Sequence, residues 1–360
     1  MKRFNSKSRL AWIRLSRKRE KKRIKRKQKF NIKKQIKTDA VTKFCNRITA
    51  PVAFELIRSK NNRLLVEFLS ILRDLVLNQK RAVKIDFSET KRMVVCGTLL
   101  FYSELCRIKR ELNSLDLISC IPPQDETVAQ VLQHLGIFKM LRYSSSVTPE
   151  RTDVINWRIA TGDSTDASEV GKILESQSKL PEIKSKKLYR GVSEAMTNVS
   201  QHAYLNLQNN SFEIGENKGW WMFCREEDDH IFVAFCDLGV GIPITLPKTI
   251  EKDQEQSILQ KILQTLFGSK SKYSDGELIR AAIEVKRSRT KKRHRGKGLL
   301  DMIKAIETTG GRLAILSNKG CYQYDASSLS PTENVKNYKN SISGTLILWS
   351  LPLNNNTEAK

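Results

Sequence analysis

The chain of 360 residues contains 64 Lys and Arg against 38 Asp and Glu, a formal net charge of +26, and 39% of its residues are hydrophobic. This composition is that of a globular protein, and the length suffices for two domains and an extension. No apolar run reaches the roughly 18 residues of a membrane span, and no apolar segment follows the basic start as in a signal peptide, so we expect a cytoplasmic protein without a transmembrane segment. The seven cysteines are scattered and include no C-x-x-C pair, which argues against a disulfide framework and a zinc site.

Residues 1–37 form a separate basic extension. They hold 18 Lys or Arg and one acid, Glu20, and therefore carry a net charge of +17. Such a segment repels itself and attracts polyanions through counterion release, so we expect it to contact nucleic acid or the ribosome. The alternatives are a membrane-surface helix that includes Leu10, Trp12 and Ile13, and a disordered solubilising arm.

The next region, residues 40–143, reads as a small α/β domain. Helical apolar spacing in "VAFELIRS" and "LLVEFLSILRDLVL" predicts that residues 40–80 are mostly helical. After them, strands at 82–87 and 115–120 alternate with helices at 97–112 and 126–137. Strand followed by helix, twice over, predicts parallel pairing in a layered domain.

Residues 144–180 are rich in Ser, Thr, Asp and Gly and are the expected domain junction, although "INWRIA" within them also fits a strand. A second, α+β domain is expected over 181–353, with residues 354–360 as a tail. Its predicted helices are the one containing "SEAMTNVSQHAY", two at about 253–267 and 276–286, and "LLDMIKAIETTG". Its predicted strands are "WWMFCRE", "IFVAFCDLG", "RLAILSN", "GCYQYD" and "GTLILWSLPL".

The helix "SEAMTNVSQHAY" carries an acid, an amide and an imidazole at even spacing. Glu194, Asn198 and His202 lie four residues apart, and positions four apart share one face of an α-helix. A separate apolar stripe faces the core. The polar row is either an ordinary solvated face or part of a site, and the helix alone does not decide between them.

Two glycine motifs follow. In "CDLGVGIP", Asp237 ends an apolar strand and Gly239 and Gly241 follow, so a ligand can approach the backbone and donate to the carboxylate. In "RGKGLL", Gly296 and Gly298 lie between a basic loop and a helix start, a setting that suits phosphate oxygens. Each motif is weak by itself.

Taken in order, these features resemble the GHKL ATPases, a family that includes gyrase, the ninety-kilodalton heat-shock chaperone and the histidine kinases. The shared series consists of a helix with polar residues four apart, a strand ending in D-x-G-x-G, a basic loop ending in G-x-G-L, and "SGT" at the start of the last strand. The segment "VSEAMTNVSQHAY" is most similar to the helix of the anti-sigma-factor serine kinases, whose pattern is E-A-x-T-N-x-x-x-H-x-Y. The resemblance covers about residues 181–353 and implies an α/β sandwich of the Bergerat type.

The resemblance implies roles for the matched residues. Asn198 would coordinate Mg²⁺ between the phosphates, Glu194 would orient or deprotonate the attacking hydroxyl or water, and Gly296 and Gly298 would close a lid over the phosphates. Oxygen ligands suit a hard cation such as Mg²⁺.

At the other end of the nucleotide, the resemblance places the adenine. Asp237 would accept a hydrogen bond from the adenine amino group, Gly239 and Gly241 would let the chain pass under the base, and Thr345 would support the adenine pocket. ATP and Mg²⁺ are therefore the expected cofactors.

The first domain resembles STAS domains, the fold of anti-sigma-factor antagonists, over roughly residues 50–142. The segment "AVKIDFSETKRMVVCGTLLFYSEL" is similar to their central strand, loop and helix. Where the family has the serine that accepts phosphate, this chain has Val95, so on this alignment phosphorylation at that position is excluded. We expect a fused regulatory or docking domain. The lone histidine before residue 181, His134, lies in an apolar helix and is expected to be packed, which disfavours a sensor histidine kinase.

Two functions remain open. The first is a Mg²⁺-dependent ATPase or serine/threonine protein kinase, regulated by the STAS-like domain and acting on or through a protein partner. The second is a nucleotide-gated interaction module that binds a protein or nucleic acid without important turnover. A homodimer is a further expectation from the family resemblance.

Overall fold

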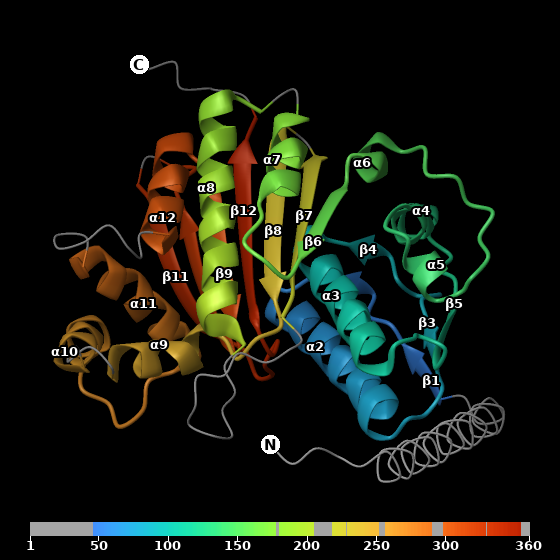
Figure 1. The fold of residues 1–360 in the computed structure, drawn as a ribbon, viewed down its shortest axis with the longest axis horizontal. Helices are drawn as coiled ribbons and strands as arrows, with labels where there is room; N and C mark the ends of the chain where they lie inside the picture. The colour runs from blue at the N-terminus through green and yellow to red at the C-terminus, as the bar shows by residue number, and fades with distance from the viewer. Residues whose placement is uncertain are drawn as a thin grey trace, which may run out of the picture.

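The computed structural model has a mixed α/β fold built around one large and two small sheets (Figure 1). It describes residues 46–177, 180–204, 218–227, 229–251, 256–289, 298–328 and 330–353. The basic extension 1–37 and the tail 354–360 lie outside these ranges, as does Cys45.

The N-terminal region contains the predicted alternation of strand and helix. β1 (Asn46–Thr49), β3 (Val83–Asp86) and β5 (Ile118–Ile121) form a parallel sheet, which confirms the parallel pairing expected from the sequence. The other elements of this region are β2 (Ala53–Phe54), α2 (Ser59–Arg73), the π-helical turn η1 (Asp74–Asn78), β4 (Arg92–Met93), α3 (Val95–Leu112), α4 (Glu126–His134) and α5 (Ile137–Met140).

The prediction of a helix over "VAFELIRS" is wrong. Ala53 and Phe54 form a short strand parallel to β4, and the helix begins only at Ser59. The Phe54 ring lies 5.2 Å from Phe101 and 6.1 Å from Phe68, in an aromatic cluster that fixes the segment in an extended form. Packing over a long sequence distance therefore overrides a helical pattern of only eight residues.

The predicted helix at 126–137 is also interrupted. Gly136 has φ +69°, a left-handed conformation that ends α4 and starts the short α5. Glycine adopts this conformation without the steric cost that a side chain brings.

The segment predicted as a junction supplies part of the large sheet. It contains α6 (Thr152–Ile155), β6 (Arg158–Gly162) and α7 (Ser168–Glu175), and β6 pairs antiparallel with β7 (Trp220–Glu227) at one edge of the sheet. The strand prediction for "INWRIA" is therefore confirmed.

The large sheet has seven strands in the order β11-β10-β9-β12-β8-β7-β6, and every neighbouring pair is antiparallel. β11 was not predicted, because its sequence TENVKN is polar and it forms the largely exposed edge of the sheet. The remaining elements are β8 (His230–Asp237), β9 (Arg312–Ser317), β10 (Gly320–Asp325), β11 (Thr332–Asn337), β12 (Thr345–Pro352), α8 (Glu182–Asn198), the π-helical turn η2 (Val199–Ala203), α9 (Ile242–Glu251), α10 (Gln256–Phe267), α11 (Asp275–Arg289) and α12 (Gly298–Thr309).

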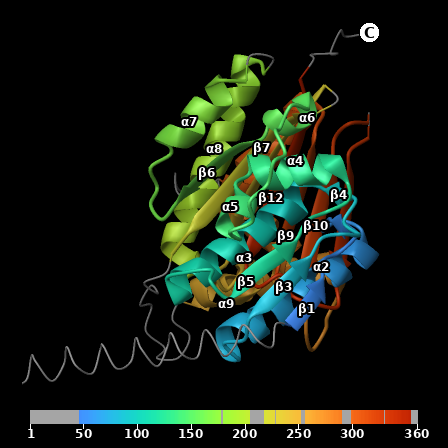
Figure 2. The same ribbon diagram turned by 90° about the vertical axis from the view of Figure 1, so that its right-hand side faces the viewer.

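Both faces of this sheet are covered. On one face, Trp220, Met222 and Val233 join a core with α7, α8, α11 and α12. On the other face, the alternate residues Trp221 and Phe223 join the core of the N-terminal region. Figure 2 shows α7 and α8 on one side of the strands and α2 and α3 on the opposite side. Because residues from both regions form one cluster, the N-terminal region and the sheet share a core.

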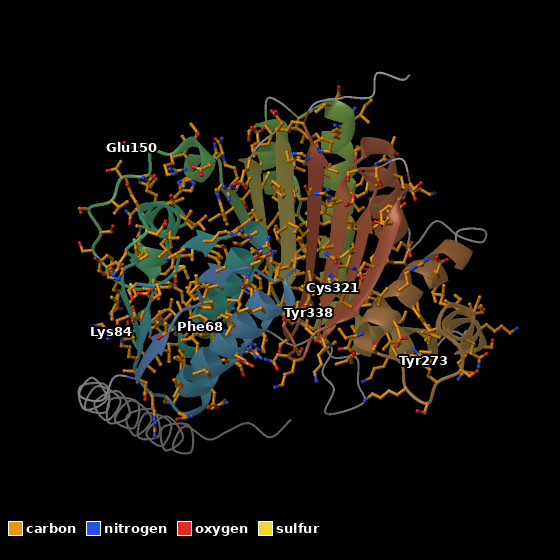
Figure 3. All side chains as sticks on the ribbon, turned by 180° about the vertical axis from the view of Figure 1, so that it is seen from behind. Phe68, Lys84, Glu150, Tyr273, Cys321 and Tyr338 are labelled. Atoms are coloured by element: carbon orange, nitrogen blue, oxygen red, sulfur yellow. The ribbon has the colours of Figure 1, made fainter. Side chains whose placement is uncertain are left out.

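Aromatic and polar contacts strengthen this shared core. The Phe223 ring lies 5.4 Å from Tyr102 and 5.8 Å from Trp157. The hydroxyl of Tyr338, labelled in Figure 3, donates to the Ile57 carbonyl at 2.8 Å and joins the end of β11 to the N-terminal region. Such contacts fix the orientation of the N-terminal region relative to the large sheet, because each of these side chains has a specific partner in the other region.

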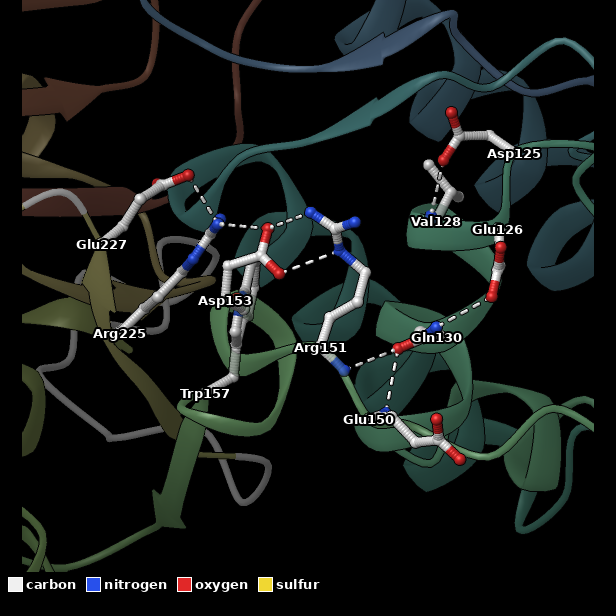
Figure 4. Close-up of polar contacts among 10 residues, drawn as sticks. All are labelled: Asp125, Glu126, Val128, Gln130, Glu150, Arg151, Asp153, Trp157, Arg225 and Glu227. Carbon is white, nitrogen blue, oxygen red and sulfur yellow. Dashed lines mark hydrogen bonds and ion pairs between the residues drawn. The ribbon is translucent and has the colours of Figure 1, made fainter.

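A polar network binds α4 and α6 to β7 (Figure 4). Asp153 accepts two hydrogen bonds from Arg151, at 2.9 and 3.1 Å, and lies 3.9 Å from the Arg225 guanidinium. That guanidinium is 5.0 Å from the centre of the Trp157 ring. The hydrogen bond from Arg151 lowers the pKa of Asp153.

Of the helices in the described part of the chain, none combines the length and the apolar character needed to cross a bilayer. The six described cysteines are free, and five of them are buried.

Candidate functional site

The candidate site lies where β8 ends beside the C-terminal end of α8. Asp237 is the last residue of β8, only 6% exposed, and stands opposite Thr345 of β12 in the register. Its carboxylate accepts hydrogen bonds from the backbone N–H of Gly239, at 2.9 Å, and of Thr345. Burial raises the pKa of Asp237 to about 7, although these two bonds act in the opposite direction.

This carboxylate has capacity for a further donor. An ionised carboxylate offers about four acceptor positions, and the two backbone N–H groups occupy only part of them. Since a buried acceptor without a donor is costly, an amino group that donates to Asp237 would stabilise the ionised form.

The two glycines after Asp237 allow the chain itself to pack closely. A Cβ on Gly239 would lie 2.2 Å from the Ala203 carbonyl oxygen, and Gly241 has φ +85° with its hypothetical Cβ 2.7 Å from the Asn318 side chain. Both positions therefore require glycine for contacts within the protein. The expectation that these two glycines let the chain pass under a bound adenine stays a prediction.

Thr345 lies next to Asp237 as expected, and it is held by Ser317, which the sequence analysis did not single out. The two hydroxyl oxygens are 3.0 Å apart, and the Ile242 backbone N–H donates to Ser317 at 2.9 Å. The Ser317 hydroxyl is fully buried at the end of β9. The signal available in the sequence was a serine at the end of the predicted strand "RLAILSN".

Glu194 and Asn198 lie one turn apart on α8, as the even spacing predicts. Both are half-buried, and among the described residues neither side chain has a hydrogen-bond partner. Because both side chains are only half-buried, their polar atoms can be reached by water or by a ligand.

The polar row enters a different helix geometry before His202. The helix changes at Val199 into the π-helical turn η2, where each hydrogen bond spans five residues instead of four. Because a π-helical turn holds slightly more than four residues, this change does not by itself move His202 off the face that carries Asn198. His202 is half-buried and has a polar partner of its own.

The π-helical turn brings the helix to the Asp237 loop. At its end, the Ala203 carbonyl accepts a hydrogen bond from the Val240 N–H at 2.7 Å. The Tyr204 hydroxyl donates to the Gly219 carbonyl at 2.6 Å and accepts from the Leu238 N–H at 3.1 Å. Burial raises the pKa of Tyr204 far above its usual range, which keeps the hydroxyl protonated as a donor. The helix motif and the D-x-G-x-G motif therefore meet in space.

The third motif is described only in part. Gly298 is the first residue of α12, whereas Gly296 lies outside the described residues, as do Arg295 and Lys297. The expected closure of this loop over phosphates stays a prediction.

The donors present fit Mg²⁺ only if the ion is shared with phosphates. Within the described ranges, no group of three or more His, Cys, Asp or Glu side chains could hold a metal ion. Mg²⁺ is commonly bound by one or two protein oxygens together with substrate phosphates. The Asn198 carboxamide oxygen and the Glu194 carboxylate on one helix face match that donor set.

The start of α3, where the STAS-like alignment puts Val95, is buried. Val95 is 2% exposed, and a Cβ on Gly97 would lie 2.3 Å from the backbone of Phe54. The nearby hydroxyls of Thr90 and Thr98 are fully buried, and that of Thr90 donates to the Pro51 carbonyl at 3.0 Å. These hydroxyls are therefore closed to a reacting phosphate in this conformation.

No family model matches the chain, and no curated protein matches it. Function must therefore be inferred from the residues of the site and their geometry.

Proposed function

We propose that residues 181–353 form a GHKL-type domain that binds Mg²⁺-ATP, with the adenine at Asp237 and the phosphates toward Glu194 and Asn198. Residues 40–143 are then a STAS-like regulatory domain fused to it. The proposal rests on the ordered motifs of the sequence and on the joining of two of them by η2.

The observation that carries the proposal is the buried Asp237 carboxylate. The Asp237 carboxylate is buried and accepts hydrogen bonds from two backbone N–H groups, but it has room for a further donor. Burial of such a group raises the free energy of the folded protein, and groups of this kind are common at binding sites. An adenine amino group would supply the missing donor. Ser317 and Thr345 hold the adjoining strand ends in place.

The half-buried pair on α8 supports the assignment of the phosphate end. Asn198 would hold Mg²⁺ through its carboxamide oxygen, and the bound ion would neutralise phosphate charge. Glu194, one turn earlier, would orient or deprotonate the attacking water or hydroxyl. Because Thr90 and Thr98 are buried, neither is expected to accept the phosphoryl group, and the expected acceptor is water or an accessible serine or threonine.

A nucleotide-gated interaction module is the second candidate, and β12 favours it. Thr345 lies at the candidate site, while the next residue, Leu346, belongs to the core shared with the N-terminal region. A change at the site could therefore alter the N-terminal surface without turnover. Equal affinity for an RNA or protein partner with and without ATP would count against this function.

The experiment that tests the enzyme proposal is steady-state ATP hydrolysis, and phosphotransfer to candidate proteins, with and without Mg²⁺. Glu194→Ala should lower turnover roughly 100-fold or more while nucleotide binding persists. Glu182→Ala is the matched control, because Glu182 lies on the same helix but pairs with Lys186 at the surface. Binding without turnover in the parent protein would favour the gated module, and turnover that survives Glu194→Ala would contradict the role given to Glu194.

A cytoplasmic location, homodimer formation and contact of residues 1–37 with nucleic acid or the ribosome remain predictions from the sequence. Removing residues 1–37 should abolish salt-dependent RNA binding if that segment supplies the contact.

A further inference from the structure

A cleft of about 580 Å³ lies between α2 and the loop that joins β11 to β12, and Asp237 is not among its lining residues. This volume is within the range of small-molecule sites. Its lining combines apolar side chains, including Leu69 and Leu100, with cations and hydroxyls. It is formed jointly by the N-terminal region and the large sheet.

The charge of this α2 cleft is positive. Lys319 and Lys339 line it, and neither forms an ion pair with any described residue. The one acid in the lining, Glu67, accepts a hydrogen bond from the Asn340 side chain at 3.2 Å. Two cations without partners therefore face the cleft together with an acid that already has a donor.

Arg73 adds guanidinium donors to the cleft. It pairs with the buried Glu104, which also pairs with Arg107 at 2.6 Å, and Arg107 in turn lies 4.0 Å from Glu111. The Nε atom of Arg73 is buried and has no hydrogen-bond partner in the described structure. Arg73 Nη1 lies 3.5 Å from the Ser343 hydroxyl on the opposite wall. Guanidinium and ammonium groups of this kind are the usual partners of phosphate and carboxylate.

We propose that the α2 cleft binds a small organic anion, with its phosphate or carboxylate at Lys319, Lys339 and Arg73 and its apolar body against Leu69 and Leu100. An apolar anion would pair with the exposed Lys319 and Lys339 and also contact the apolar part of the lining, whereas a neutral molecule would use the apolar part alone. The proposal does not rest on nucleotide binding, because none of these residues belongs to the Asp237 site.

The test is isothermal titration calorimetry of the full chain with phenyl phosphate, benzoate, phenol and inorganic phosphate. Phenyl phosphate should bind saturably and more tightly than inorganic phosphate, and phenol should not bind. The double variant Lys319→Gln with Lys339→Gln should weaken binding about tenfold or more, since each charged hydrogen bond contributes on that scale. If benzoate binds as tightly as phenyl phosphate, a carboxylate suffices; if it does not, the cleft prefers phosphate.

Three further variants make the result specific. Lys304→Gln removes an exposed charge from α12 and should leave binding unchanged. Asp237→Asn should also leave it unchanged, which distinguishes the cleft from the proposed nucleotide site. Ser343→Asp places a negative charge beside Arg73 and should abolish binding in a folded protein, as judged by its melting temperature. The absence of saturable phenyl phosphate binding, or binding that the double variant retains in full, would overturn the proposal.

Discussion

The two faces of the seven-stranded sheet use alternate residues of the same strands but are closed differently. On the N-terminal face, Trp221 and Phe223 pack against aromatic and aliphatic side chains of α3 and its neighbours. On the α8 face, the packed core gives way near the strand ends to polar groups, including Asp237, Glu194 and Asn198.

The difference separates an apolar contact that joins two regions from strand ends that carry polar groups. Around Trp221 and Phe223 the contacts are apolar, whereas Glu194 and Asn198 keep polar atoms without a partner in the described protein. The cationic α2 cleft is a separate hollow between the same two regions. The N-terminal region therefore completes the core of the sheet, and any regulation it exerts would pass through shared strands such as β12. The following predictions test this contrast.

The largest expected effect is on stability, at the N-terminal face. Phe223→Ala removes a fully buried ring that contacts Tyr102 and Trp157, and it should lower the free energy of unfolding by about 3–5 kcal/mol. Phe232→Ala, at a half-buried position on the same face, should cost less. Urea denaturation followed by circular dichroism measures both. Because the core is shared, one transition is expected; separate melting of the N-terminal region would contradict a shared core.

The next prediction concerns the pH dependence of Asp237. Its pKa is raised from 3.8 to about 7, so the folded state holds a proton that the unfolded state has lost between these values. Without nucleotide, stability should therefore fall as the pH rises from about 4 to 7 and then level off. Asp237→Asn should remove this component. Thermal melting across this range checks it, and an identical pH profile for parent and variant would refute the assignment.

A smaller effect is expected at Tyr204. Tyr204→Phe leaves the Leu238 N–H and the Gly219 carbonyl without their partner and should cost about 1–3 kcal/mol in the free energy of unfolding. It should also weaken ATP binding, because the Asp237 loop loses an anchor. Tyr189→Phe on the exposed part of α8 is the control and should change neither quantity. Equal behaviour of the two variants would show that the hydroxyl is not an anchor.

The smallest effect is expected in the network of Figure 4. The hydrogen bond from Arg151 lowers the pKa of Asp153, so the interaction stabilises the protein above pH 3.8 and is lost as the pH falls through the lowered pKa. Asp153 is partly exposed, so Asp153→Asn should cost less than about 1 kcal/mol at neutral pH. Acid denaturation between pH 5 and 2 should show a shallower loss of stability in the variant. A loss above 3 kcal/mol would mean that solvent does not screen the pair.

Much of the fold follows from local pattern. The strands of the large sheet with long apolar runs and the periodic helices α3, α10, α11 and α12 were predicted with boundaries close to those observed. The runs "WWMFC" and "IFVAFC" also carried a signal that went unused. An antiparallel strand with one solvated face alternates apolar and polar residues, so an unbroken apolar run indicates that both faces are buried.

The remainder depends on contacts between distant residues. β2 and β4 are strands of two residues each, defined only by their pairing with one another. The π-helical turn at Val199 exists where the helix end meets the Asp237 loop, which helical periodicity cannot indicate. Ser317 gains its role from Thr345 and Ile242, both far away in sequence.

The candidate site was predicted in part. Glu194, Asn198, Asp237 and Thr345 were named from motifs, and the structure brings Asp237 and Thr345 into register and joins α8 to the loop after Asp237. The motif with Gly296 cannot be compared, because that residue lies outside the described part of the chain.

Titration of Mg²⁺-ATP into the parent protein and Asp237→Asn at pH 8, followed by calorimetry, tests the central claim most directly. At this pH the Asp237 carboxylate is ionised, so the parent should bind one ATP per chain and the variant should bind roughly 10- to 100-fold more weakly, as expected for loss of a hydrogen bond to a charged group. Parent protein that binds no ATP, or equal affinity in the two proteins, would contradict the proposed adenine site.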